Sequence, residues 1–157
     1  MTKPIPAGFH SLTPHIVVTD GAAAIEFYKK AFGVQELSRL LTPDGKIVMH
    51  AQLKIGDSIL MLGSEFPPNA LSPKSRGGTS VYLHLYLADA DAAFDRALKA
   101  GCKVIMPVSD TFWGDRYGVV EDPFRHQWSI ATHKYDYTPE QIAANAGEFM
   151  AKMGKCE

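Results

Sequence analysis

Residues 15–33 read HIVVTDGAAAIEFYKKAFG, and residues 84–101 repeat the same pattern as HLYLADADAAFDRALKAG. Each stretch has an apolar run, an aspartate, a segment with apolar residues at helical spacing, and a closing glycine. Asp20 and Asp89 can each accept hydrogen bonds from the first free amides of a helix, at the favourable end of its dipole. Because self-similarity of this kind marks a repeated unit, the sequence predicts two copies of one strand–helix module.

Three short strands are expected after each helix, separated by turn signals such as Pro-Asp-Gly and Gly-Asp. Their ranges are 35–41, 47–54 and 58–63 in the first copy, and 103–108, 116–121 and 127–132 in the second. The predicted fold class is therefore α+β. Two βαβββ modules are expected to form an incomplete barrel around a cavity, with a further C-terminal helix.

The whole chain, residues 1–157, is expected to form a single domain. Module one spans about 9–64, a linker rich in Pro, Ser and Gly spans 65–79, and module two spans 80–134. The C-terminal helix is predicted over 138–153, opened by a capping box. Its apolar face must dock either on the body of the protein or on a partner subunit, and both remain open.

The composition is that of an ordinary globular protein, with 46% hydrophobic and 21% charged residues. A net charge of −1 gives no electrostatic reason to expect nucleic acid or an anionic membrane as a partner. Residues 1–9 lack the apolar core of a signal peptide, and no apolar stretch approaches the roughly 20 residues of a spanning helix. Cys102 and Cys156 match no zinc or redox spacing. A cytoplasmic protein is expected.

Two motifs carry a family resemblance. FWGDRYG at 112–118 and DPFRHQWSIATH at 122–133 resemble the second-module signature of glyoxalase-like and bleomycin-resistance-like proteins. The chain is similar to the vicinal-oxygen-chelate superfamily (glyoxalase, bleomycin resistance protein, extradiol dioxygenase) from Ser11 to His133. The resemblance implies the fold but not the substrate, because one fold hosts many chemistries. Since relatives of this size commonly dimerise, it also implies a homodimer.

One position departs from the family pattern. Arg125 stands in the turn after Asp122 where related sequences usually carry glycine. If this position needs a positive φ, the arginine is strained by about 1 kcal/mol; alternatively, the turn has a different shape.

The resemblance also implies where a divalent metal would bind in metal-dependent relatives. The matching positions here are Thr13, Tyr82, Ser129, and Leu60 or Met61. Neutral Thr, Tyr and Ser do not supply the three N or O donors that such a site needs, so no metal and no other cofactor is expected.

A shifted metal site is the alternative. His15 and His84 lie two residues beyond the family's positions, on the same strand faces, and His50 could join them to hold Zn, Ni, Mn or Fe. No carboxylate is placed to complete this set. The simpler interpretation is that each histidine lines the cavity and is satisfied by hydrogen bonds.

Strand alternation predicts which residues line the cavity. They are Thr13, His15, His50, Tyr82, His84 and Tyr86, with Ser129 on the opposite wall and Trp113, Arg116 and Tyr117 near the opening. Aromatic area with a few polar groups is typical of a pocket for a small organic ligand. Arg116 could pair with a ligand carboxylate, or form a salt bridge to Asp110, Asp115 or Glu121.

The sequence is compatible with three functions. The favoured one is a metal-independent protein that binds a small aromatic or amphipathic molecule. The second is a metal-dependent lyase, isomerase or dioxygenase that uses the shifted His15/His84 site. The third is a metal-free enzyme with His84 as the catalytic general base.

Overall fold

The computed structural model describes residues 3–153 of the chain. The first module contains β1 (His15–Val18), α1 (Gly21–Phe32), β2 (Gln35–Leu41), β3 (Val48–Ile55) and β4 (Ser58–Ser64). The second contains β5 (Tyr82–Tyr86), α3 (Ala90–Ala100), β6 (Lys103–Asp110), β7 (Asp115–Glu121) and β8 (Gln127–His133). A short helix, α2 (Pro73–Arg76), lies in the segment predicted as a linker, and α4 (Pro139–Met153) ends the described chain.

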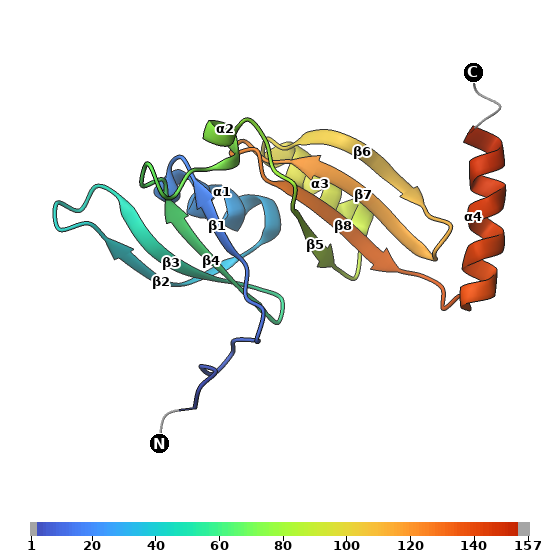
Figure 1. Ribbon diagram of the computed structural model, residues 1–157, viewed down its shortest axis with the longest axis horizontal. Helices are drawn as coiled ribbons and strands as arrows, with labels where there is room; N and C mark the ends of the chain where they lie inside the picture. Colours follow the sequence, from blue (N-terminus) through green and yellow to red (C-terminus); the bar gives the residue numbers. More distant parts are fainter. Residues whose placement is uncertain (1–2, 154–157) are drawn as a thin grey trace.

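Each module forms its own four-stranded sheet, in the orders β1-β4-β3-β2 and β5-β8-β7-β6. The first strand of each module pairs in parallel with the last one, and the other neighbours are antiparallel. The α+β fold with two βαβββ modules is thus confirmed. The two sheets are open and do not close into a barrel (Figure 1).

The predicted helix starts are confirmed in both modules. Asp20 Oδ1 accepts a hydrogen bond from Ala23 N at 3.0 Å, and Asp89 Oδ1 accepts one from Ala92 N at 2.9 Å. Gly33 ends α1 in the left-handed region with φ 66°, where a residue without a Cβ is favoured. The repeated sequence pattern therefore encodes the same helix start twice, whereas the closing glycines differ, since Gly101 has φ 123°.

The two modules are joined through a shared core and one buried carboxylate. Asp122, 3% exposed in the β7–β8 turn, accepts hydrogen bonds from Tyr28 Oη of α1 at 2.7 Å and from Trp128 Nε1 at 2.9 Å. Trp128 is itself 1% exposed, as expected for a residue on the helix-facing side of its strand. Because Tyr28 and Asp122 belong to different modules, this bond fixes one module against the other.

The turn that holds Asp122 adopts the strained one of the two alternatives for Arg125. Arg125 adopts φ 68°, in the region that favours glycine. Asp122 Oδ1 accepts from the backbone N–H groups of Phe124 and His126, each at 2.9 Å, and so holds the turn in this shape. Arg125 Nε also lies 3.8 Å from Glu121 Oε1.

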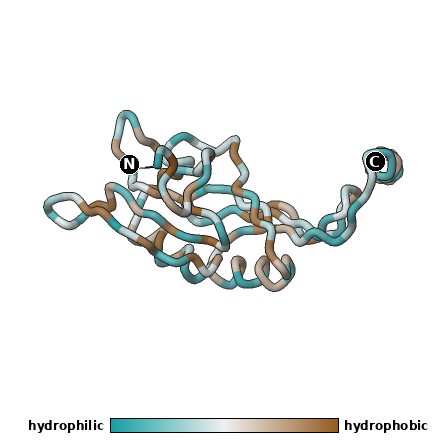
Figure 2. The backbone as a smooth tube through the Cα atoms, turned by 90° about the horizontal axis from the view of Figure 1, so that it is seen from below, coloured by the Kyte–Doolittle hydropathy of each residue, from teal (hydrophilic) through white to brown (hydrophobic). Residues whose placement is uncertain are grey.

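Helix α4 stands at the far end of the second module (Figures 1 and 2). The predicted capping box is present, with Thr138 and Gln141 exchanging backbone-to-side-chain hydrogen bonds at 2.9 and 3.3 Å. The helix touches the β6–β7 turn of its own chain, where the rings of Phe149 and Phe112 lie 5.6 Å apart, but Phe149 and Met150 are 45% and 66% exposed, so the described chain leaves much of the apolar face uncovered. Within the described residues, no helix is long and apolar enough to cross a membrane.

Candidate functional site

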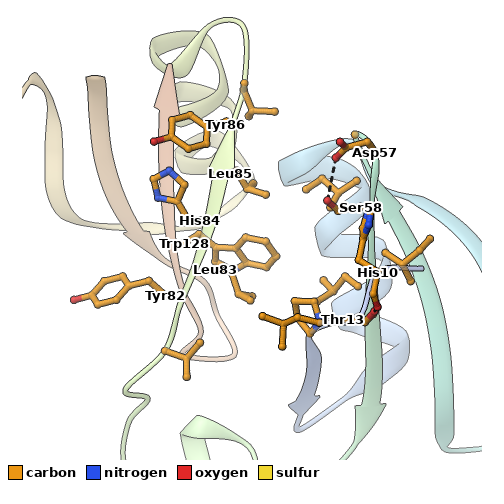
Figure 3. Close-up of a pocket in the computed structure, with 18 residues that line it drawn as sticks. His10, Thr13, Asp57, Ser58, Tyr82, Leu83, His84, Leu85, Tyr86 and Trp128 are labelled. Carbon is orange, nitrogen blue, oxygen red and sulfur yellow. Dashed lines mark hydrogen bonds between the residues drawn. The ribbon is translucent and has the colours of Figure 1, made fainter. Parts of the chain in front are cut away.

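The open face of the second sheet gathers most of the predicted site residues. In β5, Leu83 and Leu85 turn toward the helix side, while Tyr82, His84 and Tyr86 turn to the opposite side (Figure 3). The parallel neighbour of His84 on β8 is Ser129. The prediction that Ser129 lies on an opposite wall was wrong, because β8 is hydrogen-bonded directly to β5.

His84 is anchored to this neighbour. Its Nδ1 lies 2.7 Å from Ser129 Oγ, and the serine is only 1% exposed beneath the imidazole. Burial lowers the pKa of His84 below its ordinary value, although the charge of Asp115 acts in the other direction. The ring is therefore held in place and favours its neutral form.

A buried carboxylate organises the neighbouring side chains. Asp115, at the start of β7 and 2% exposed, accepts hydrogen bonds from Tyr86 Oη at 2.9 Å, Trp113 Nε1 at 3.0 Å and His133 Nδ1 at 2.8 Å. Burial acts to raise the pKa of Asp115, but these hydrogen bonds outweigh it and lower the pKa. The carboxylate thus fixes side chains from three segments.

Sequence reasoning missed this role of Asp115. The available signal was strand alternation, because Asp115 lies two residues before Tyr117 and so shares its face of the strand. A hydrogen-bond partner on β5 could not be inferred without knowing that β8 separates the two strands.

Aromatic rings surround the imidazole. The His84 ring centroid lies 4.5 Å from that of Tyr86 and 5.9 Å from that of Tyr117, the second pair being close to parallel at 23°. Trp113 meets Tyr117 edge-on at 5.4 Å. We call this surface the His84 face, and it is made by Tyr82, His84, Tyr86, Trp113, Tyr117 and Ser129.

Two predicted residues lie instead on the open face of the first sheet. The rings of His15 and His50 meet edge-on at 5.5 Å. Gly63 of β4 lies between their strands, and a Cβ built there would meet the backbone carbonyl oxygen of Met49 at 3.0 Å and make an ordinary contact with His15 Nε2 at 3.6 Å. Burial, followed by the charge of His50, lowers the pKa of His15. The structure therefore pairs His15 with His50, and the ring neighbours of His84 among the described residues are Tyr86 and Tyr117.

The two remaining predicted residues are bonded away from the His84 face. Thr13 Oγ1 donates to the backbone carbonyl of His10 at 2.9 Å, before β1 begins. Arg116 forms a bidentate ion pair with Asp91 of α3, at 2.8 and 2.9 Å, and a longer one with Asp110 at 3.4 Å. Of the two predicted roles for Arg116, the structure shows the salt bridge, with Asp91 as the partner that the sequence did not indicate.

A cleft of about 760 Å³ lies between the modules, on the other side of β5 from the His84 face. Figure 3 shows Leu83, Leu85 and Trp128 on one wall, and His10, Thr13 and Ser58 across from them. Four of the residues predicted to line the cavity, Thr13, Tyr82, His84 and Tyr86, also border this cleft. Tyr82, His84 and Tyr86 border the cleft where β5 passes along it, and their rings extend to the other side of the strand (Figure 3).

The residues at the family's metal positions do not fit a divalent ion. Ser129 is hydrogen-bonded to His84, Thr13 is hydrogen-bonded to a carbonyl, and Leu60 is an apolar core residue, 3% exposed. Between residues 3 and 153, no three His, Cys, Asp or Glu side chains are grouped so that they could hold a metal ion. The donor chemistry at these positions does not support the metal site of metal-dependent relatives.

Comparison with known proteins identifies the family. Residues 8–130 match the family described as the glyoxalase/bleomycin resistance protein/dioxygenase superfamily. The chain belongs to this superfamily. An uncharacterised protein of Mycobacterium bovis is 46% identical over 138 residues, which cover 85% of this chain and 90% of that protein.

Solved structures give the same result for the fold of this superfamily member. TioX from Micromonospora sp. ML1 superposes with a TM-score of 0.65 at 28% identity, covering 79% of this chain and 98% of TioX. A bleomycin resistance determinant encoded on transposon Tn5 superposes with a TM-score of 0.60 at 16% identity, covering 80% and 99%. The second likeness concerns the fold alone.

Proposed function

We propose that this protein binds a small organic molecule on the His84 face, without a bound metal ion. The observation that carries the proposal is the convergence of six predicted residues on one sheet face. There, a fixed imidazole is surrounded by aromatic rings and is held by a buried serine. Ligand sites of this kind combine apolar and aromatic area with a few oriented polar groups.

The exposure of the aromatic rings supports the proposal. Tyr82 is 54% exposed and Tyr86 is 62% exposed, although both present large apolar surfaces. Contiguous exposed apolar area on a soluble protein marks a surface that contacts something. A planar ligand would cover these rings and recover their hydrophobic contribution, which is about 25 cal/mol per Å² of apolar area buried.

We propose that a second copy of the chain packs against the remaining open sheet surface. Exposed apolar side chains are present in both modules: Leu40 and Met49 in the first, and Val104, Ile105 and Met106 in the second. A homodimer would bury such area, since stable interfaces remove about 1,600 Å² from water. Light scattering coupled to size-exclusion chromatography should give the mass of a dimer, and a monomer at all concentrations would contradict this part. A cytoplasmic location stays a prediction.

The binding site is tested by a matched pair of tyrosine variants. Tyr82→Ala removes a ring from the His84 face, and Tyr135→Ala removes a ring of similar exposure, 59%, outside it. Calorimetry with a panel of planar aromatic compounds should find a ligand that the Tyr82 variant binds at least about tenfold more weakly, with no change in the Tyr135 variant. Equal weakening in both variants, or no binding by any compound, would refute the proposed site.

Metal content is tested separately, by elemental analysis of protein purified without chelators. The proposal expects far less than one equivalent of Zn, Ni, Mn or Fe per chain. One equivalent that disappears in His84→Ala would instead support the shifted metal site, and with it a lyase, isomerase or dioxygenase reaction.

A further inference from the structure

The hydrogen bond between His84 and Ser129 carries information about the proton on the imidazole. A serine hydroxyl has one proton to donate and two lone pairs that can accept. Ser129 is 1% exposed, and among the described residues its Oγ has one hydrogen-bond partner, His84 Nδ1 at 2.7 Å. The same pair can form in two ways, with the proton of this bond supplied either by the serine or by the ring.

The two arrangements differ in what they leave unsatisfied. If Nδ1 donated, the buried hydroxyl proton of Ser129 would have no acceptor, and a buried unsatisfied donor is costly. If Ser129 donates, all that is left over is hydroxyl lone pairs, which proteins leave unpaired more readily than donors. This difference favours donation by Ser129 by about tenfold or more in population.

We infer that Ser129 fixes His84 as the tautomer with its proton on Nε2, so that the His84 face takes a planar ligand that presents a hydrogen-bond acceptor to this N–H. The inference rests on the proposed function of the face and names the chemistry of its ligand. Burial lowers the pKa of His84, which favours a neutral ring. A protonated ring would also leave the serine proton without an acceptor, as donation by Nδ1 does.

The other polar groups around His84 do not accept a hydrogen bond from its Nε2–H group. Asp115 is the nearby carboxylate, and it already accepts from Tyr86, Trp113 and His133. No protein acceptor for His84 Nε2 is present among residues 3–153. The acceptor must therefore come from solvent or from the ligand, and a conjugated carbonyl compound supplies both an acceptor oxygen and a flat surface for the rings of Tyr86 and Tyr117.

The proton on His84 Nε2 also affects whether His84 could bind a metal ion or act as a general base. A histidine nitrogen binds a metal ion, or accepts a proton as a general base, only through a free lone pair. With Nε2 protonated and Nδ1 occupied by Ser129, His84 has no free lone pair to offer. The serine therefore directs this histidine toward hydrogen-bond donation.

Three compounds of nearly the same shape test the inference. Fluorenone has a carbonyl acceptor, fluorene has no polar group, and carbazole has an N–H donor. Their affinities are measured by calorimetry for the wild type, His84→Gln, which places an amide donor near the position of Nε2, and His84→Asn, whose amide is too short to reach it. In parallel, long-range proton–nitrogen correlation spectra of the ligand-free wild type and Ser129→Ala identify which nitrogen of His84 carries the proton.

The expected result is that fluorenone binds at least about tenfold more tightly than the other two compounds. His84→Gln keeps this preference and His84→Asn loses it, and the wild-type proton lies on Nε2 with a mixture of tautomers in Ser129→Ala. Equal affinities for the three compounds, or a wild-type proton on Nδ1, would overturn the inference while leaving the binding site intact. A proton on Nε2 with no binding of any compound would support the assigned tautomer and overturn the proposed function instead.

Discussion

The two modules place a histidine at the same point of the same fold, yet within residues 3–153 His84 has a side-chain hydrogen bond and His15 has none. His15 and His84 each sit on the first strand of a module, on its open face, beside the last strand. The neighbour of His84 is Ser129, which bonds to the ring at 2.7 Å, whereas the neighbour of His15 is Met61, which offers no comparable hydrogen bond. One side chain on the parallel neighbour therefore decides whether the imidazole becomes an oriented donor.

The turns before the last strands also differ between the modules, in the burial and hydrogen bonding of their aspartates. In the second module, Asp122 is buried and accepts four hydrogen bonds, from Tyr28, Trp128, Phe124 and His126. In the first module, Asp57 occupies the short β3–β4 turn, is exposed, and accepts from the adjacent Ser58 at 3.0 Å. The two modules therefore share their backbone arrangement, but their turn aspartates differ in burial and in the number of hydrogen bonds.

The largest expected effect comes from removing the two turn aspartates in parallel. Asp122→Ala should lower the free energy of unfolding by about 3 kcal/mol, because it leaves buried N–H and O–H donors without an acceptor. Asp57→Ala should change it by less than about 0.5 kcal/mol. Denaturant unfolding measures both, and comparable losses in the two variants would contradict the contrast between the modules.

A smaller effect is expected at the strained turn residue. Arg125→Gly should raise the free energy of unfolding by about 0.5 kcal/mol, since relief of the left-handed strain at φ 68° exceeds the entropic cost of glycine. Arg125→Ala is the control, because it keeps the strain and loses the long contact with Glu121. A gain in the alanine variant equal to that in the glycine variant would show that backbone strain is not the cause.

A further substitution transfers the second module's arrangement to the first. Met61→Ser places a hydroxyl beside His15, in the register that Ser129 has beside His84. Long-range proton–nitrogen spectra should then show the His15 proton on Nε2 in a larger fraction of molecules than in the wild type. An unchanged His15 tautomer would mean that strand register alone is insufficient, and that the burial of Ser129 is also required.

The smallest effects are in the titration of the histidines. Hydrogen bonds to Asp136 and then Asp115 raise the pKa of His133, whereas burial lowers the pKa values of His84 and His15. The stabilisation from His133 is therefore present below its unfolded pKa of about 6.5 and is lost as the pH rises through its folded pKa. For His84 and His15 it is present above about pH 6.5 and is lost as the pH falls through their lowered pKa values.

NMR titration of the ring protons checks these directions. Asp136→Asn should bring the midpoint of His133 down and leave that of His84 unchanged. A midpoint for His84 above that of His133 would contradict the electrostatic account of the face.

Much of the fold could be predicted because its signals are local. The capping aspartates Asp20 and Asp89, the closing Gly33 and the helical spacing of apolar residues each depend on neighbours only a few positions away. The positive φ of Arg125 was also predictable, from the glycine usual in that turn. The capping aspartates and the helical spacing recur in both copies, so each copy supported the interpretation of the other.

The site was predictable only in part, because its bonds connect distant strands. Alternation correctly placed Tyr82, His84 and Tyr86 on one face, but it could not reveal that β8 is the neighbour of β5, and so Ser129 was expected across a cavity. The ion pair of Arg116 with Asp91 depends on how α3 lies over the sheet. Strand order and helix placement are set by the whole core, and no local spacing encodes them.

The most direct test of the central claim is to map fluorenone onto the protein by NMR. The account predicts that signals of His84, Tyr86 and Tyr117 shift most and saturate together. It also predicts that the shifts of Tyr86 and Tyr117 need at least about tenfold more fluorenone to saturate in His84→Asn. Largest shifts at Leu83 and Leu85 in the cleft, with the His84 signals unchanged, would contradict the assignment of the ligand site to the His84 face.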